Sequence, residues 1–146
     1  MDGLAVAGAN RRVRWLGAAA TVATLAVGGC ATSGFERLPS LGVAELSGDV
    51  QVARIKVNSH FFEPNRLIVQ VGVRVRLVLE NDSLLAGHAF VVFAPEADLE
   101  INVYVPARQQ VTVQFVPHEI GEFTFYCNIN DHAERGATGT LVVVER

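Results

Sequence analysis

Alternation of apolar and polar positions dominates the chain beyond residue 49. From Leu67 to Leu79 every odd position is apolar, whereas the even positions include Gln70 and Arg74. A period of two is typical of a β-strand that buries one face. Gly72 interrupts the run and marks a turn or bulge in its middle.

Six further short segments show strand-like composition, with turn-forming residues between them. They are Val50–Val57, His88–Phe93, Glu100–Val105, Gln110–Val116, Glu122–Cys127 and Thr138–Glu145. This part of the sequence has no convincing amphipathic helical pattern. The 146 residues suffice for one domain. We therefore expect an all-β fold, an antiparallel β-sandwich of seven to eight strands.

The first thirty residues differ from the rest. Arg11, Arg12 and Arg14 precede an uncharged apolar run from Trp15 to Gly29. Basic residues before a run that is too short to span a bilayer comfortably are typical of a secretory signal. We expect residues 1–29 to be a signal peptide and the protein to be exported.

The apolar run ends at a cysteine. Val27-Gly28-Gly29-Cys30 resembles a bacterial lipobox, in which the cysteine is lipidated and the preceding peptide is removed. We expect residues 30–48 to be a lipidated Cys30 and a flexible tether, and residues 49–146 to be the folded domain. The protein would then sit on the cell membrane, facing the periplasm or the extracellular side. A plain signal peptide, a short membrane anchor and a Cys30–Cys127 disulfide are the alternatives.

The net charge and the distribution of basic residues indicate which kinds of partner the protein can bind. The formal net charge is −3, and the chain has no Lys/Arg cluster after the arginines of the signal. Nucleic-acid-binding surfaces and polybasic membrane patches both need such a cluster. We expect no nucleic-acid partner, and contact with the membrane through the lipid anchor alone.

Cys127 and His132 are candidate metal ligands on a short loop, and an earlier strand carries His88. Cys127 is in phase with Phe125, and His88 is in phase with Phe90, so both side chains should face the core. Inward polar groups need partners, because burial without one costs stability. One thiolate and two imidazoles suit a single copper ion that shuttles one electron.

Residues 50–145 resemble a small blue-copper protein of the cupredoxin family. The features that carry the resemblance are Val69–Val73, Leu79–Asn81, Gly87–Val92, Tyr126–His132 and Gly136–Val143. The resemblance implies a Greek-key sandwich in which His88, Cys127 and His132 bind one copper ion that alternates between Cu(I) and Cu(II). It also implies a monomer that exchanges electrons with protein redox partners.

The resemblance fails at one position of the expected site. The family usually places an axial methionine five residues after the loop histidine, where this chain has Ala137, and its one methionine is Met1. A weak axial ligand helps to tune the potential of such a site. The copper could be three-coordinate, the Gly87 carbonyl could bind axially, or water, Glu134 or Glu63 could fill the space.

We expect an extracytoplasmic, membrane-tethered copper protein that carries single electrons and is not an enzyme. A module for copper capture, delivery or sensing is the alternative, as are a red-copper-like site with an open axial position and a degenerate structural domain. A binuclear copper centre is excluded because position 131 is Asp131 and not a second cysteine. We expect His118 to be an exposed loop residue, and His60 to lie at the surface or beneath the site.

Overall fold

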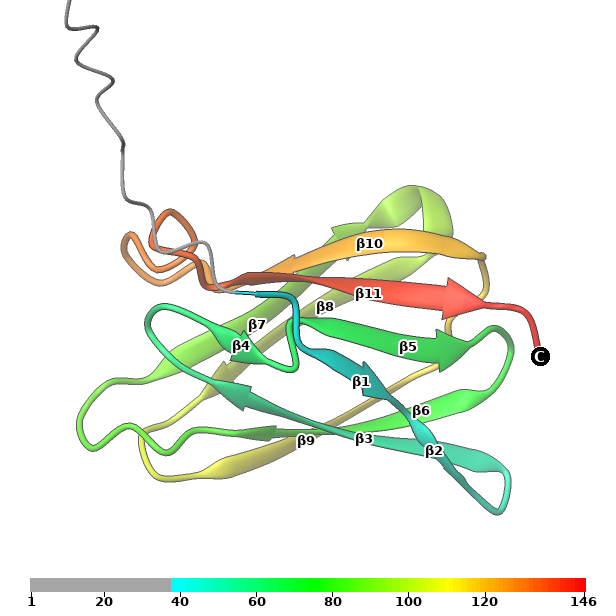
Figure 1. Cartoon of the computed structure of the whole chain (residues 1–146), viewed down its shortest axis with the longest axis horizontal. Helices are drawn as coiled ribbons and strands as arrows, with labels where there is room; N and C mark the ends of the chain where they lie inside the picture. The colour runs from blue at the N-terminus through cyan, green and yellow to red at the C-terminus, as the bar shows by residue number, and fades with distance from the viewer. Residues whose placement is uncertain (1–37) are drawn as a thin grey trace, which may run out of the picture. The chain divides into compact units, whose positions relative to one another are not determined.

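Eleven β-strands and one short 3-10 helix make up residues 38–146, the part of the chain that the computed structural model describes (Figure 1). Residues 1–37, with the predicted signal peptide and Cys30, lie outside the described residues. The elements are β1 (Leu41–Val43), β2 (Glu45–Ser47), β3 (Val50–Val57), β4 (Phe62–Glu63), β5 (Arg66–Gln70), β6 (Arg74–Glu80), β7 (His88–Ala94), η1 (Pro95–Ala97), β8 (Leu99–Val105), β9 (Gln110–Phe115), β10 (Gly121–Tyr126) and β11 (Thr138–Val144). Within residues 38–146, no helix is long and apolar enough to cross a bilayer.

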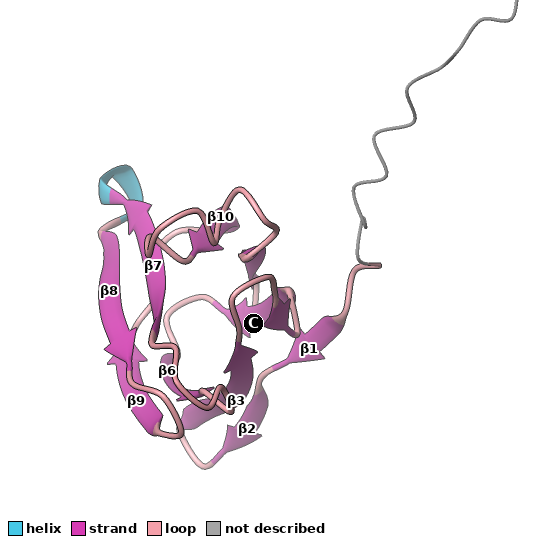
Figure 2. Cartoon of the chain, turned by 90° about the vertical axis from the view of Figure 1, so that its left-hand side faces the viewer, coloured by secondary structure: helices cyan, strands magenta, loops and turns pink. Residues whose placement is uncertain are grey.

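The strands form two sheets around a common interior (Figure 2). One sheet has the order β1-β5-β11-β10-β7-β8, and the other has the order β2-β3-β6-β9, with β4 paired to β3. Leu67, Val69, Val75, Leu77 and Leu79 are all buried, as their alternation predicts. The all-β sandwich is therefore confirmed.

The sheets are mixed, which corrects the expectation of an antiparallel sandwich. Strand β3 runs parallel to β6, and β5 runs parallel to both β1 and β11. A tight hairpin cannot connect two parallel strands. In each parallel pair here, the two strands are therefore separated in the sequence by at least one other strand. Alternation along a segment reports which face is buried and leaves the direction of the neighbouring strand open.

The structure has more strands than the seven or eight that the pattern predicts. The run from Leu67 to Leu79 divides into β5 and β6 at a turn where Gly72 has a φ of +71°. Strands β1 and β2 lie inside the predicted tether, so residues 41–47 are not a flexible linker. Both are short strands whose side chains are mostly exposed, and no buried alternation marks them in the sequence.

Three phenylalanines join the two sheets at the centre of the core. Phe62 on β4, Phe90 on β7 and Phe125 on β10 are fully buried. The ring of Phe62 lies edge-on to the other two, with centroids 6.0 Å and 5.1 Å away, and the centroids of Phe90 and Phe125 are 5.0 Å apart. The strands that carry the predicted ligands are therefore anchored by one aromatic cluster.

We predict that Phe62→Ala lowers the free energy of unfolding by about 3–5 kcal/mol, because it leaves a cavity between the sheets. Urea denaturation of the metal-free protein, followed by circular dichroism, measures the change. Phe93→Ala is the matched control, since Phe93 on β7 is 66% exposed and its truncation leaves no buried cavity. Equal losses in the two variants would contradict the central role of the cluster.

Candidate metal centre

The three predicted ligands converge at one end of the sandwich. His88 is the first residue of β7, Cys127 directly follows β10, and His132 lies on the loop that leads to β11. One nitrogen of each imidazole and the thiol sulfur all lie within 4.8 Å of one another. His88 and Cys127 are fully buried, and His132 is 8% exposed. The structure thus brings together the residues that the sequence singled out.

The donor atoms face one another across a short gap. The Cys127 Sγ lies 3.4 Å from Nδ1 of His132, which in turn lies 3.3 Å from Nδ1 of His88. Cys127 is a free thiol, in contrast to the disulfide alternative. A buried thiol with two imidazoles is a soft, nitrogen-rich donor set, and such a set suits copper well.

The ligand loop is closed by backbone hydrogen bonds through Ala137. The Ala137 N–H donates to the carbonyl of His132 at 2.9 Å, and the Ala137 carbonyl accepts from the N–H of Cys127 at 3.0 Å. His132 also donates its N–H to the carbonyl of Ile129 at 3.1 Å. Ala137 is fully buried. One residue therefore fixes the backbone of two ligands, and it is the residue at the expected axial position.

Gly136 permits the sharp return of this loop. Its φ is +107°, and a Cβ there would lie 3.0 Å from the carbonyl oxygen of His60. On the outer side of the loop, Arg135 pairs with Asp131, and this hydrogen bond lowers the pKa of the Asp131 carboxyl. The loop that carries His132 is thus shaped by close backbone packing on one side and an exposed ion pair on the other.

The surroundings of His88 favour the neutral form that binds a metal, and the sulfur of Cys127 accepts a hydrogen bond. Burial lowers the pKa of His88, as do the nearby rings of His132 and His60, so the imidazole stays neutral and keeps a lone pair. The backbone N–H of Ala89 donates to the Cys127 Sγ at 3.3 Å. Hydrogen bonding to a cysteine sulfur is one of the factors that set the potential of a copper–thiolate site.

The carboxylate candidates for the axial ligand do not join the cluster. Glu63 and Glu134 are exposed, and the clustered group contains no carboxylate from residues 38–146. Gly87 has a packing role of its own, since a Cβ there would overlap the hydroxyl of Tyr104. The identity of the axial ligand stays a prediction.

The other two histidines lie outside the cluster. The side chain of His118 is exposed in the loop between β9 and β10, as expected. His60 is also exposed, although its carbonyl oxygen packs against Gly136 on the ligand loop. His60 therefore supports the loop through its backbone.

Sequence reasoning missed one polar neighbour of the site. The Ser83 Oγ lies 3.0 Å from Nε2 of His88, on the side of the ring away from His132. Ser83 belongs to no recognisable motif. Its position five residues before His88, in the loop that leads to β7, was the one available signal.

Comparison with known proteins agrees with this geometry. The model of the cupredoxin-like domain family matches residues 18–143, whereas no curated protein matches the sequence. The metal-binding domain of the Cu(I)-exporting P-type ATPase CopA of Streptococcus pneumoniae is 18% identical with a TM-score of 0.53, and the match covers 75% of this chain and 100% of that one. Auracyanin A, a "blue" copper protein of Chloroflexus aurantiacus, is 19% identical with a TM-score of 0.56, covering 65% of this chain and 99% of that one.

A third solved structure with the same fold is auracyanin of Roseiflexus castenholzii, which is 15% identical with a TM-score of 0.57, covering 64% of this chain and 96% of that one. At such identities, the solved structures establish the fold. The family model spans most of the sequence, and the buried donor set suits the metal of that family. The chain therefore belongs to the cupredoxin-like domain family, and its cofactor is a single copper ion.

Proposed function

We propose that this protein is an extracytoplasmic, membrane-tethered copper protein that carries single electrons between protein redox partners. His88, Cys127 and His132 are the proposed copper ligands. The observation that carries the proposal is their buried cluster, in which one thiol and two imidazoles lie within 4.8 Å of one another. A copper ion in such a donor set supplies a one-electron couple between Cu(I) and Cu(II).

Electron carriers need ligands that move little when the charge of the metal changes. Here the backbone N–H of Cys127 is bound to the carbonyl of Ala137, and its sulfur accepts from Ala89. The Ala137 N–H holds the backbone of His132. These bonds limit rearrangement of the ligands. His132 is the one proposed ligand with any exposed surface, at 8%, so a partner would approach the site most closely at this residue.

Copper capture, delivery or sensing is the second candidate function. The observation that favours it is Ala137, whose methyl side chain cannot bind a metal at the position where the family usually has a methionine. A set of three donors suits copper that must also be released. One solved structure with this fold is the metal-binding domain of a Cu(I)-exporting ATPase. A red-copper-like site with an open axial position, as an enzyme would need, is a third and weaker candidate.

We predict that the copper-loaded protein has an intense absorption band in the orange-red region of the visible spectrum and that Cys127→Ser abolishes this band. We also expect the copper of the wild type to be oxidised and reduced reversibly. A serine hydroxyl is a poor copper ligand and gives no thiolate-to-copper charge transfer. Absorption spectroscopy and cyclic voltammetry on the same samples measure both properties.

An unchanged band in Cys127→Ser would refute Cys127 as the ligand. A wild type that passes its copper rapidly to a Cu(I) chelator and gives no reversible wave would favour the delivery function. His118→Ala is the matched control, because the exposed His118 lies outside the cluster and its removal should change neither property.

We predict that Ala137→Met lowers the reduction potential, because a thioether added to an empty axial position stabilises Cu(II) relative to Cu(I). Voltammetry of the two copper-loaded proteins gives the shift. A rise in potential would indicate that an oxygen ligand occupies the axial position in the wild type. Glu134→Ala or Glu63→Ala should then reproduce part of that rise. No change in potential or spectrum would show that residue 137 does not face the copper.

The strand register supports a tether at the metal end of the domain. Leu41 pairs with Arg66, which pairs with Thr140 near the start of β11, and these strands are parallel. The ligand loop ends where β11 begins, so the start of β1, three residues after Leu38, lies at the same end as the copper ligands (Figure 1). A fully extended chain gains at most about 3.6 Å per residue, so a lipid on Cys30 would keep this end within roughly 30 Å of the bilayer.

We predict that Cys30→Ala abolishes lipidation and releases the exported protein from the membrane, while copper binding is unchanged. The thiol of Cys30 is the proposed acylation site, and the copper ligands proposed within residues 38–146 are His88, Cys127 and His132. Mass spectrometry of the purified protein and membrane fractionation test the first part, and a copper titration tests the second. An unmodified Cys30 in the exported wild type would contradict the anchor.

A further inference from the structure

The imidazole of His88 has a polar partner on each side. Its Nδ1 faces the cluster, 3.3 Å from Nδ1 of His132, and its Nε2 lies 3.0 Å from the Ser83 Oγ. A neutral imidazole carries its proton on one nitrogen, and the partner of that nitrogen decides which one is left to bind a metal. The ring of His88 is fully buried, so water does not readily replace a lost partner.

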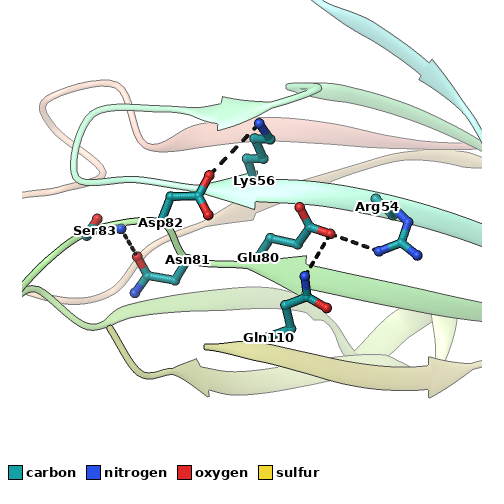
Figure 3. A network of polar contacts seen from close by, with 7 residues as sticks. All are labelled: Arg54, Lys56, Glu80, Asn81, Asp82, Ser83 and Gln110. Carbon is teal, nitrogen blue, oxygen red and sulfur yellow. Dashed lines mark hydrogen bonds and ion pairs between the residues drawn. The ribbon is translucent and has the colours of Figure 1, made fainter. Parts of the chain in front are cut away.

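Ser83 is held in place by the buried side chain of Asn81. The Asn81 Oδ1 accepts the backbone N–H of Ser83 at 2.9 Å, as Figure 3 shows. The Asn81 Nδ2 donates to the carbonyls of Ala86 at 2.9 Å and Val105 at 3.0 Å. Asn81 is 2% exposed. One amide thus ties both ends of the loop before His88 to the end of β8.

We propose that Ser83 is a positioning residue of the copper site. The Nε2–H of His88 donates a hydrogen bond to the Ser83 hydroxyl oxygen, which leaves Nδ1 free to bind the metal and fixes the orientation of the ring. Asn81 holds the loop in the shape that this contact requires. The inference rests on the proposed role of His88 as a ligand and adds a residue that neither the family match nor the clustered donors identify.

The other polar contacts in this region stay at the surface. Arg54 pairs with Glu80 at 2.8 Å, and Lys56 pairs with Asp82 at 3.9 Å (Figure 3). Neither pair includes His88. Asp82 is the immediate neighbour of Ser83 in the loop and is exposed. Asp82→Ala is therefore a matched control that changes the same loop and leaves the contact with His88 in place.

The direct test is the tautomer of His88 in the copper-free full-length protein, read from the ¹⁵N chemical shifts of the imidazole. We expect the wild type, Ser83→Thr and Asp82→Ala to keep the proton on Nε2, and Ser83→Ala to show a mixture of tautomers. Competition with a Cu(I) chelator should show that Ser83→Ala binds copper 10- to 100-fold more weakly, roughly the loss typical of removing a partner of a metal-ligating histidine. Ser83→Thr should restore most of the affinity, because it retains the hydroxyl.

A Ser83→Ala variant with the wild-type tautomer, or with the copper affinity of Asp82→Ala, would overturn the inference. His88→Ala, measured in parallel, separates this failure from failure of the proposed ligand set. If His88→Ala binds copper as tightly as the wild type, His88 is not a ligand and both proposals fall. If only His88→Ala weakens binding, the ligand assignment stands and Ser83 has no positioning role.

Discussion

The pairing of β7 with β10 is the contact on which the metal site depends. It joins Val92 to Phe125 and Val91 to Tyr126, and it is confined to these positions. Beyond it, toward the site, the backbone of Ala89 reaches the sulfur of Cys127. The rings of Phe90 and Phe125, tilted by 34° to one another, hold the two strands together from the core side. A change of register by one residue would turn the thiol away from the core, because side chains alternate along a strand.

Burying three polar side chains at an apolar end of the core would lower the stability of the fold if they had no polar partners. In this structure the three side chains contact one another. Each ligand atom lies near another member of the cluster, and His88 has a further partner outside it. No buried side-chain nitrogen or oxygen within residues 38–146 lacks a hydrogen-bond partner. The low dielectric constant of the interior makes buried polar groups destabilising when they lack partners. The same low dielectric constant strengthens their interaction with a bound cation. Stability and metal binding therefore draw on the same arrangement.

Ala137 affects both the backbone conformation of the ligand loop and the set of donors that the loop offers to a metal. Its backbone fixes Cys127 and His132 at once, a task that any L-residue except proline could perform in this conformation. Its side chain supplies no donor, so the clustered donors within residues 38–146 are two imidazoles and one thiol. The N–H of Ala89 donates to the sulfur, and the hydroxyl of Ser83 contacts His88. These hydrogen bonds around the ligands are the means by which we propose that the protein tunes its copper site, since position 137 offers no donor side chain.

The sequence alone determined the β-rich fold and the faces that its strands bury, because alternation is a local property of each segment. The phase of His88 and Cys127 with their aromatic neighbours, and the short spacing from Cys127 to His132, were enough to predict the cluster. The parallel pairing of β3 with β6, the strands at residues 41–47 and the contact between Ser83 and His88 were decided by the tertiary structure. Each of these features depends on which segments become neighbours and in what register. A local pattern of polar and apolar residues does not specify either one.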